Sequence, residues 1–231
     1  MDDQAVYLVP IGSGNFELYT EPVDDDEPGD APDERGGFWR RTIRALGERW
    51  RQAVHAAHAD RGAESGSGRL ARARDWLVRR IAESIAEQRT LWSLRSVTSA
   101  SFVYPADLTE ASGTAVRKRL LAEASRHHGR WLVVNLVGVA VTAVLVLLPG
   151  PNLIGYYFAF RVVGHFLSWR GARQALDHVT WRPSAEPILS ELGGLAHVPR
   201  DERAERVEAL VAQLDLPRLA AFFDRVACPP R

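Results

Sequence analysis

The stretch WLVVNLVGVAVTAVLVLL, residues 131–148, decides the fold that the sequence predicts, because it contains no charged side chain. A helix rises about 1.5 Å per residue, so this run would be about 27 Å long, close to the roughly 30 Å hydrocarbon thickness of a bilayer. An uncharged run of this length favours a helix in a membrane. A buried helix of a soluble helical protein is the alternative.

The run ends at a turn made of Pro149, Gly150, Pro151 and Asn152. Proline ends a helix because it lacks an N–H donor and its ring clashes with the preceding turn. Residues 153–169, LIGYYFAFRVVGHFLSW, are again apolar and aromatic. The sequence therefore predicts a hydrophobic helical hairpin, transmembrane or re-entrant, over residues 131–169. Arginines flank both of its ends, which places both termini in the cytoplasm.

Four polar side chains of this hairpin are candidates for a site. Asn135 and Thr142 share one face of the first helix, and Arg161 and His165 lie one turn apart on the second. An arginine at this depth costs at least about 3 kcal/mol. Either Asn135, Thr142 and carbonyls of the turn satisfy Arg161 and fix the packing, or Arg161 and His165 line a polar functional site in which His165 titrates near neutral pH. Neither helix contains Asp or Glu, which disfavours a site for a bare cation in this hairpin alone.

The rest of the chain divides by composition. In residues 1–21, two β-prone runs flank Gly12-Ser13-Gly14-Asn15, a pattern typical of a β-hairpin. Residues 22–37 are rich in acid, proline and glycine and indicate a flexible linker. Residues 38–130 form an amphipathic helical region, and residues 170–231 include short helices over 201–213 and 216–227. The predicted class is mostly α, with an N-terminal β-hairpin, amphipathic cytoplasmic helices and the hydrophobic hairpin.

The basic helix expected over residues 38–61 has two interpretations. As an interfacial helix it would place its tryptophans among lipid headgroups and its arginines against anionic lipid. As a packed helix it would bury its apolar stripe against the helix expected over residues 69–92, with the arginines in solvent. We favour packing with membrane proximity.

Composition and motifs exclude several classes of protein. The 231 residues carry 29 basic and 29 acidic side chains, which argues against a nucleic-acid binder with a basic surface. Cys228 is the only cysteine, so there is no disulfide framework and no thiolate zinc site. The acidic start does not resemble a signal or transit peptide.

Histidine pairs do not point to a metal. His55 and His58, and the adjacent His127 and His128, lack Cys, Asp or Glu at ligand spacing and are interpreted as surface or interfacial histidines. The sequence also shows no nucleophile elbow, phosphate loop or Cys–His pair. We therefore expect no catalytic residues, no metal, no cofactor and no enzymatic activity.

Two parts of the sequence resemble the mitochondrial K+–H+ exchange-related family. Around the hairpin, the similar residues run over about 115–180 and include Leu147-Leu148-Pro149-Gly150-Pro151-Asn152, Tyr156-Tyr157, Arg161, His165, Trp169, Arg170 and Gly171. At the start, Tyr7-Leu8-Val9-Pro10 and Glu17-Leu18-Tyr19 also match. The resemblance implies an inner-membrane protein tied to potassium/proton exchange and to volume control. The missing transit peptide and the acidic linker depart from the mitochondrial pattern and indicate a bacterial member.

The sequence thus predicts an integral membrane protein associated with potassium/proton exchange, acting as an oligomeric component or regulator. It would lie in the bacterial inner membrane with cytoplasmic termini. Its partners would be membrane lipid and a second copy or another membrane protein, with no nucleic acid. The alternative is a membrane-anchored interaction or scaffold protein that transports nothing.

Overall fold

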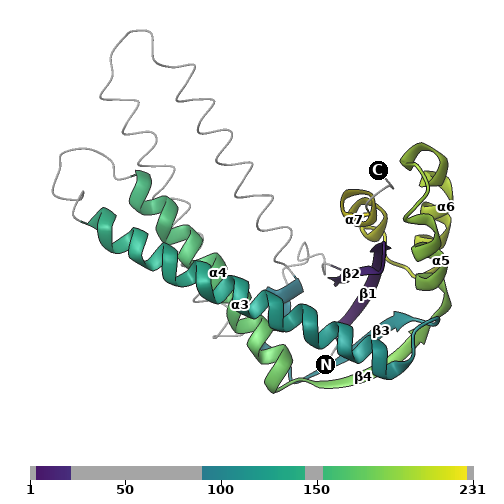
Figure 1. Ribbon diagram of the computed structural model, residues 1–231, viewed down its shortest axis with the longest axis horizontal. Coiled ribbons are helices and arrows are strands. Elements are labelled where there is room, and N and C mark those ends of the chain that lie inside the picture. Colours follow the sequence, from purple (N-terminus) through teal and green to yellow (C-terminus); the bar gives the residue numbers. More distant parts are fainter. Residues whose placement is uncertain (1–3, 22–89, 144–152, 228–231) are drawn as a thin grey trace, which may run out of the picture. The chain divides into compact units, whose positions relative to one another are not determined.

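The computed structural model describes residues 4–21, 90–143 and 153–227 (Figure 1). The chain forms two compact units, which are described separately. The first comprises Met1–Asp24, Arg89–Ser125 and Arg170–Arg231, and the second comprises Asp25–Gln88 and Arg126–Trp169. The linker expected over residues 22–37, the helices expected over 38–61 and most of 69–92, and the turn at residues 149–152 lie outside the described residues.

A four-stranded sheet organises the first unit, in the order β2-β1-β3-β4 (Figure 1). Strand β1 pairs antiparallel with β2, whereas the β1–β3 and β3–β4 pairs are parallel. The strands are β1 (Gln4–Gly12), β2 (Asn15–Tyr19), β3 (Ser99–Pro105) and β4 (Thr180–Glu186). A short 3-10 helix, η1 (Leu94–Ser96), precedes β3.

The predicted N-terminal β-hairpin is confirmed. Tyr7 pairs with Tyr19 across β1 and β2, and the chain reverses between Gly12 and Asn15. Gly12 and Gly14 have φ values of 97° and 71°, and Ser13 lies between them at 53°. Glycine adopts such positive φ angles without steric penalty, so the two glycines permit the tight reversal.

The mostly α fold class is wrong, because the protein is a mixed α/β structure with two strands that the sequence did not reveal. Parallel strands require a crossover connection, and helices usually supply it. Here α3 (Glu110–Ala143) and α4 (Leu153–Asp177) lie between β3 and β4 in the chain. Pro183 is tolerated inside β4 because this strand is at the edge of the sheet, where one row of N–H groups is not paired.

The prediction of a transmembrane or re-entrant hairpin is also contradicted. Among the described helices, none is long and apolar enough to cross a membrane. Helix α3 is polar in its first half and apolar only in its second half, and the described residues of this helix end at Ala143. In α4, Arg161, His165 and Ser168 interrupt the apolar pattern. Residues 144–148, which completed the predicted span, lie outside the described part of the chain.

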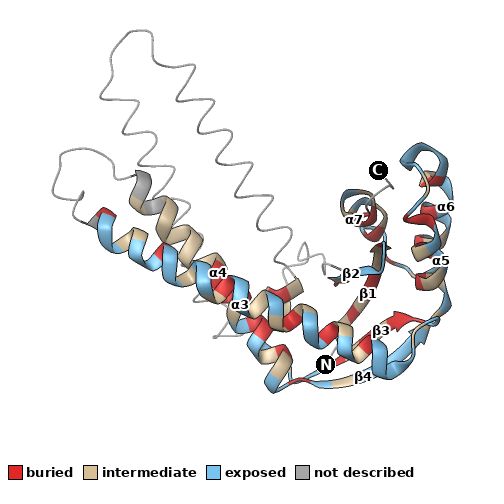
Figure 2. Cartoon of the chain, viewed as in Figure 1, coloured by how far each residue is buried: buried red, intermediate tan, exposed pale blue. Residues whose placement is uncertain are grey.

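Helices cover both faces of the sheet in the first unit. On one face, Leu121 of α3 and Ala172 and Ala175 of α4 pack with Val6, while Leu8, Phe102 and Tyr104 form an adjoining cluster. On the other face, Val9 and Tyr19 pack against α5 (Pro187–Leu195), α6 (Arg200–Gln213) and α7 (Leu219–Val226) (Figure 2). Full burial of one such Val, Leu or Phe side chain stabilises the fold by roughly 1.5–3 kcal/mol. Helices α6 and α7 confirm the two helices predicted near the C-terminus.

Helix α3 begins at Glu110. The hydroxyl oxygen of Thr109 accepts a hydrogen bond from the N–H of Ser112 at 3.2 Å, so Thr109 is the residue that caps the helix. Asp107, two residues before Thr109, contacts α5: the Ser190 hydroxyl donates to its Oδ1 at 2.7 Å. The loop between β3 and α3 is thereby attached to the layer on the opposite face of the sheet.

Candidate functional site

The candidate site lies in the second unit, where α3 and α4 contact each other through buried histidines. His128 of α3 and His165 of α4 are 8% and 4% exposed. The two helices approach closely because glycines face aromatic rings. A Cβ on Gly138 would lie 2.5 Å from Phe158, and one on Gly129 would lie 3.2 Å from Trp169.

A directed chain of hydrogen bonds joins three side chains at this contact. Nη2 of Arg161 lies 3.1 Å from Nε2 of His165, and Nδ1 of His165 lies 2.9 Å from Nδ1 of His128. Arginine is only a donor, so Nε2 of His165 must accept and the proton of that ring must be on Nδ1. Nδ1 of His165 then donates to Nδ1 of His128, whose own proton is on Nε2. The geometry thus assigns one tautomer to each ring.

Burial keeps both rings uncharged. It is the main cause that lowers the pKa of His128 to about 4, assisted by the neighbouring His165, His127 and Arg161. Burial likewise lowers the pKa of His165 to about 4, with Arg161 and then His127 as further causes. No Asp or Glu occurs anywhere in residues 126–169 to oppose these effects. Both histidines are therefore neutral at pH 7, in agreement with the tautomers that the hydrogen bonds require.

Aromatic rings surround the charged member of the chain. The guanidinium carbon of Arg161 lies 5.9 Å from the ring centroid of Trp131 and 6.0 Å from that of Tyr157. The Trp131 ring also stacks on His165, with centroids 6.3 Å apart and an angle of 16° between the planes. Cation–π attraction of this kind contributes about 0.5–2 kcal/mol. It stabilises Arg161 in a segment that offers no carboxylate.

The structure brings together two of the four predicted site residues, Arg161 and His165, as their spacing of one helical turn predicted. The other two bond to their own helix. Nδ2 of Asn135 donates to the carbonyl of Trp131 at 2.6 Å, and the hydroxyl of Thr142 donates to that of Gly138 at 2.8 Å. These bonds use donors of the two side chains, whereas Arg161, which is only a donor, would need an acceptor from them.

His128 is the functional candidate that sequence reasoning missed. It was interpreted, with His127, as a surface or interfacial histidine, whereas it is buried against His165. A signal was available in its position. His128 precedes Asn135 by seven residues, which is two helical turns, and so shares the helix face that was already assigned to the polar site.

The arrangement favours proton chemistry over metal binding. Within residues 4–21, 90–143 and 153–227, no group of three or more His, Cys, Asp or Glu side chains is placed to hold a metal ion. The two Nδ1 atoms of the buried pair face each other, and the remaining acceptor nitrogen, Nε2 of His165, faces Arg161. Every lone pair of the two rings is thus committed inside the chain of hydrogen bonds.

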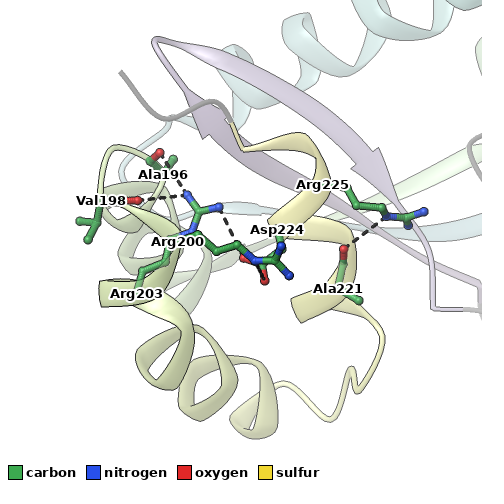
Figure 3. Close-up of polar contacts among 7 residues, drawn as sticks. All are labelled: Ala196, Val198, Arg200, Arg203, Ala221, Asp224 and Arg225. Atoms are coloured by element: carbon green, nitrogen blue, oxygen red, sulfur yellow. Dashed lines mark hydrogen bonds and ion pairs between the residues drawn. The ribbon is translucent and has the colours of Figure 1, made fainter. Parts of the chain in front are cut away.

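A second buried cluster, in the first unit, is a structural clamp. Arg203 of α6 is 2% exposed, and its Nη1 donates to the carbonyls of Ala196 and Val198, each at 3.3 Å (Figure 3). Its Nη2 lies 3.4 Å from Oδ1 of Asp224 in α7, whose Oδ2 accepts from Arg200 at 3.2 Å. The buried cation therefore has a carboxylate partner and joins α6, α7 and the turn after α5.

The fold and the site define a mixed α/β protein with a buried histidine pair to which an arginine donates. The chain belongs to the mitochondrial K+-H+ exchange-related family, whose family model matches residues 6–179. The match confirms the resemblance that the sequence suggested, and it includes the whole chain of hydrogen bonds formed by Arg161, His165 and His128. No curated protein and no solved structure gives a significant match.

Proposed function

We propose that this protein acts in potassium–proton exchange as a proton-responsive regulator without catalytic activity of its own, and that Arg161, His165 and His128 form the responsive group. The observation that carries the proposal is the direction of the hydrogen bonds. In the arrangement present at neutral pH, the chain from Arg161 through His165 to His128 has no acceptor atom left for an added proton.

Protonation of either ring is therefore incompatible with this arrangement. A protonated His165 would present Nε2–H to Arg161, and a protonated His128 would present Nδ1–H to the Nδ1–H of His165. Each change sets two donors against each other within about 3 Å and adds a positive charge beside Arg161. Because proton binding requires the contact to open, acidification favours a second arrangement of α3 and α4.

The family relationship supports potassium–proton exchange as the process that this proton-responsive group would regulate. A regulator fits the site better than a carrier does, because residues 126–169 contain no carboxylate to hold a bare potassium ion. The regulator would transmit its state to the exchange system through a second copy or another protein.

The proposal can be tested by measuring potassium-driven recovery of internal pH after an acid load. Cells expressing the full-length chain would be compared with cells expressing His165→Gln, His128→Gln or Arg161→Met. We expect each variant to shift the pH at which recovery is half-maximal, because each removes a member of the hydrogen-bonded chain. His178→Gln is the matched control, since His178 is an exposed histidine at the end of α4.

Two outcomes would contradict the proposal. If all three variants were expressed and recovered with the wild-type pH dependence, the histidine pair would have no role in exchange. If recovery did not depend on the chain at all, its function would lie in binding other proteins. Circular dichroism and thermal unfolding of each purified variant would show whether it retains the native fold.

A further inference from the structure

Arg117 of α3 is a buried cation in the first unit, between two aromatic rings. Its side chain is 5% exposed. The guanidinium carbon lies 4.6 Å from the ring centroid of Phe102 in β3 and 4.4 Å from that of Trp181 in β4. Trp181 is held in place by a hydrogen bond from its Nε1 to the carbonyl of Ala175, at 3.0 Å. The rings and the arginine thus form a fixed group between the helix and the sheet.

This cation has no counter-charge among the described residues. There it makes no hydrogen bond or ion pair, and its Nε is enclosed without a partner. Burial alone lowers its pKa to about 10, with no opposing effect from a carboxylate. Arg203, the other buried arginine, has Asp224 and two carbonyls as partners. Among the described residues, the buried guanidinium of Arg203 therefore has a carboxylate partner, whereas that of Arg117 contacts only aromatic rings.

Aromatic faces satisfy only part of what a buried guanidinium requires. Cation–π attraction acts above and below the plane of the group, whereas its N–H donors point outward within that plane. A buried charge is normally paired, because the loss of hydration costs several kcal/mol. The in-plane donors of Arg117 match the two oxygens of a carboxylate or a phosphate, which arginine binds through paired hydrogen bonds.

The edge strand β4 is exposed beyond Trp181. Pro183 and Ala185 follow Trp181 at steps of two along this edge strand, so they share its face of the sheet, and both are exposed. Lys118, the only lysine of the chain, follows Arg117 on α3 and is exposed as well. A second positive charge one residue from Arg117 increases the local concentration of anions.

We propose that Arg117, held between Phe102 and Trp181, is a binding site for the oxyanion group of a small molecule, a carboxylate or a phosphate. The aromatic rings orient the guanidinium before binding, and the oxyanion supplies the counter-charge to its in-plane donors. This inference does not depend on the role of the histidine pair, since every residue that it uses belongs to the first unit.

Thermal unfolding of the full-length chain tests the site. Sodium phosphate, sodium acetate and sodium chloride would be compared at equal ionic strength over a range of concentrations. A ligand that binds only the folded state raises Tm as its concentration exceeds Kd. We expect a rise of a few degrees that depends on concentration with phosphate, acetate or both, relative to chloride. The active anion identifies which oxyanion the site takes.

The variants assign the effect to Arg117. Arg117→Met should abolish the rise, whereas Arg119→Met, an exposed arginine on the same helix, should retain it. If Arg117→Met does not fold, NMR of the wild-type chain provides the alternative test of the site. The Nε–Hε signal of Arg117, assigned by its loss in Arg117→Lys, should shift on addition of the active anion. Equal Tm in all three salts, an undiminished rise in Arg117→Met, or an unchanged Nε–Hε signal would each overturn the proposal.

Discussion

Nδ1 of His128 and Nδ1 of His165 lie 2.9 Å apart, so two chemically identical atoms face each other across the contact between α3 and α4. Such a contact is attractive only if one atom carries a proton and the other does not. Arg161 determines which of the two Nδ1 atoms carries the proton, because it donates to Nε2 of His165 and so leaves the proton of that ring on Nδ1. A residue outside the pair therefore sets the direction of the hydrogen bond within it.

The first prediction concerns the tautomers of the two rings. In 15N NMR spectra at pH 7, His165 should be protonated on Nδ1 and His128 on Nε2. Arg161→Met should remove this preference in His165, because Nε2 then has no donor opposite it. The exposed His178 provides the reference spectrum of a ring outside the cluster. Finding His165 protonated on Nε2 in the wild type would contradict the assigned direction.

The second prediction concerns stability against pH. The pKa of both buried histidines is about 4 in the folded chain, below the usual value near 6.5. Between these values the unfolded chain binds more protons, so the free energy of unfolding decreases as pH falls from about 6.5 to about 4. We expect the two rings together to lower the free energy of unfolding by several kcal/mol across this range, since one pKa unit corresponds to about 1.4 kcal/mol. Urea unfolding at several pH values would measure it.

The matched variants for this pH dependence are the double change His128→Gln with His165→Gln, and the single change His178→Gln. The double variant should lose most of the slope between pH 6.5 and 4, because it removes both groups with a lowered pKa. The single variant should keep the slope. A double variant that retained the full slope would assign the pH dependence to other residues.

The third prediction concerns the clamp between α6 and α7. Asp224→Ala should decrease the free energy of unfolding by about 2–4 kcal/mol, because it leaves the buried Arg203 without its carboxylate partner. Arg200→Ala removes the exposed partner of the same carboxylate and should cost less than about 1 kcal/mol. Chemical denaturation would measure both losses. Equal losses in the two variants would show that the burial of Arg203 does not determine the decrease in the free energy of unfolding.

The fourth prediction concerns two glycines of the first unit. A Cβ on Gly171 of α4 would overlap the backbone carbonyl oxygen of Leu91, so Gly171→Ala should destabilise the protein by about 2 kcal/mol or more. Nothing lies within 4 Å of a Cβ built on Gly194 of α5, so Gly194→Ala should be neutral or stabilising by up to about 1 kcal/mol. Thermal unfolding of both variants would distinguish the close approach from a general effect of alanine.

The sequence predicted those structural features that depend on residues close to one another in the chain. The glycine pattern between Gly12 and Asn15 predicted the hairpin of β1 and β2, and apolar spacing predicted α6 and α7. The spacing of Arg161 and His165 predicted their contact. Each of these features forms within a few residues, where turn chemistry and helical periodicity act directly.

Features that depend on distant partners were not predicted. Strand β3 pairs with β1 and with β4 only across long connections, and a proline such as Pro183 is unusual inside a strand. The apolar C-terminal part of α3 was interpreted as part of a membrane hairpin, because an apolar sequence alone does not show whether the helix contacts lipid or protein. His128 was missed because its partner is on another helix, although its position two turns before Asn135 placed it on the face assigned to the polar site.

The pairing of the sheet also has a consequence for the order in which the protein folds. The parallel ladders join Gln4 with Ala100 and Ser99 with Thr180, so each closes a loop of many residues before it gains a hydrogen bond. Loop closure costs entropy and slows folding. We expect the β1–β2 hairpin and the α5–α7 helices to form early, and the parallel pairings on both sides of β3 to form late. The central strand β3 would then be the part of the sheet whose formation limits the folding rate.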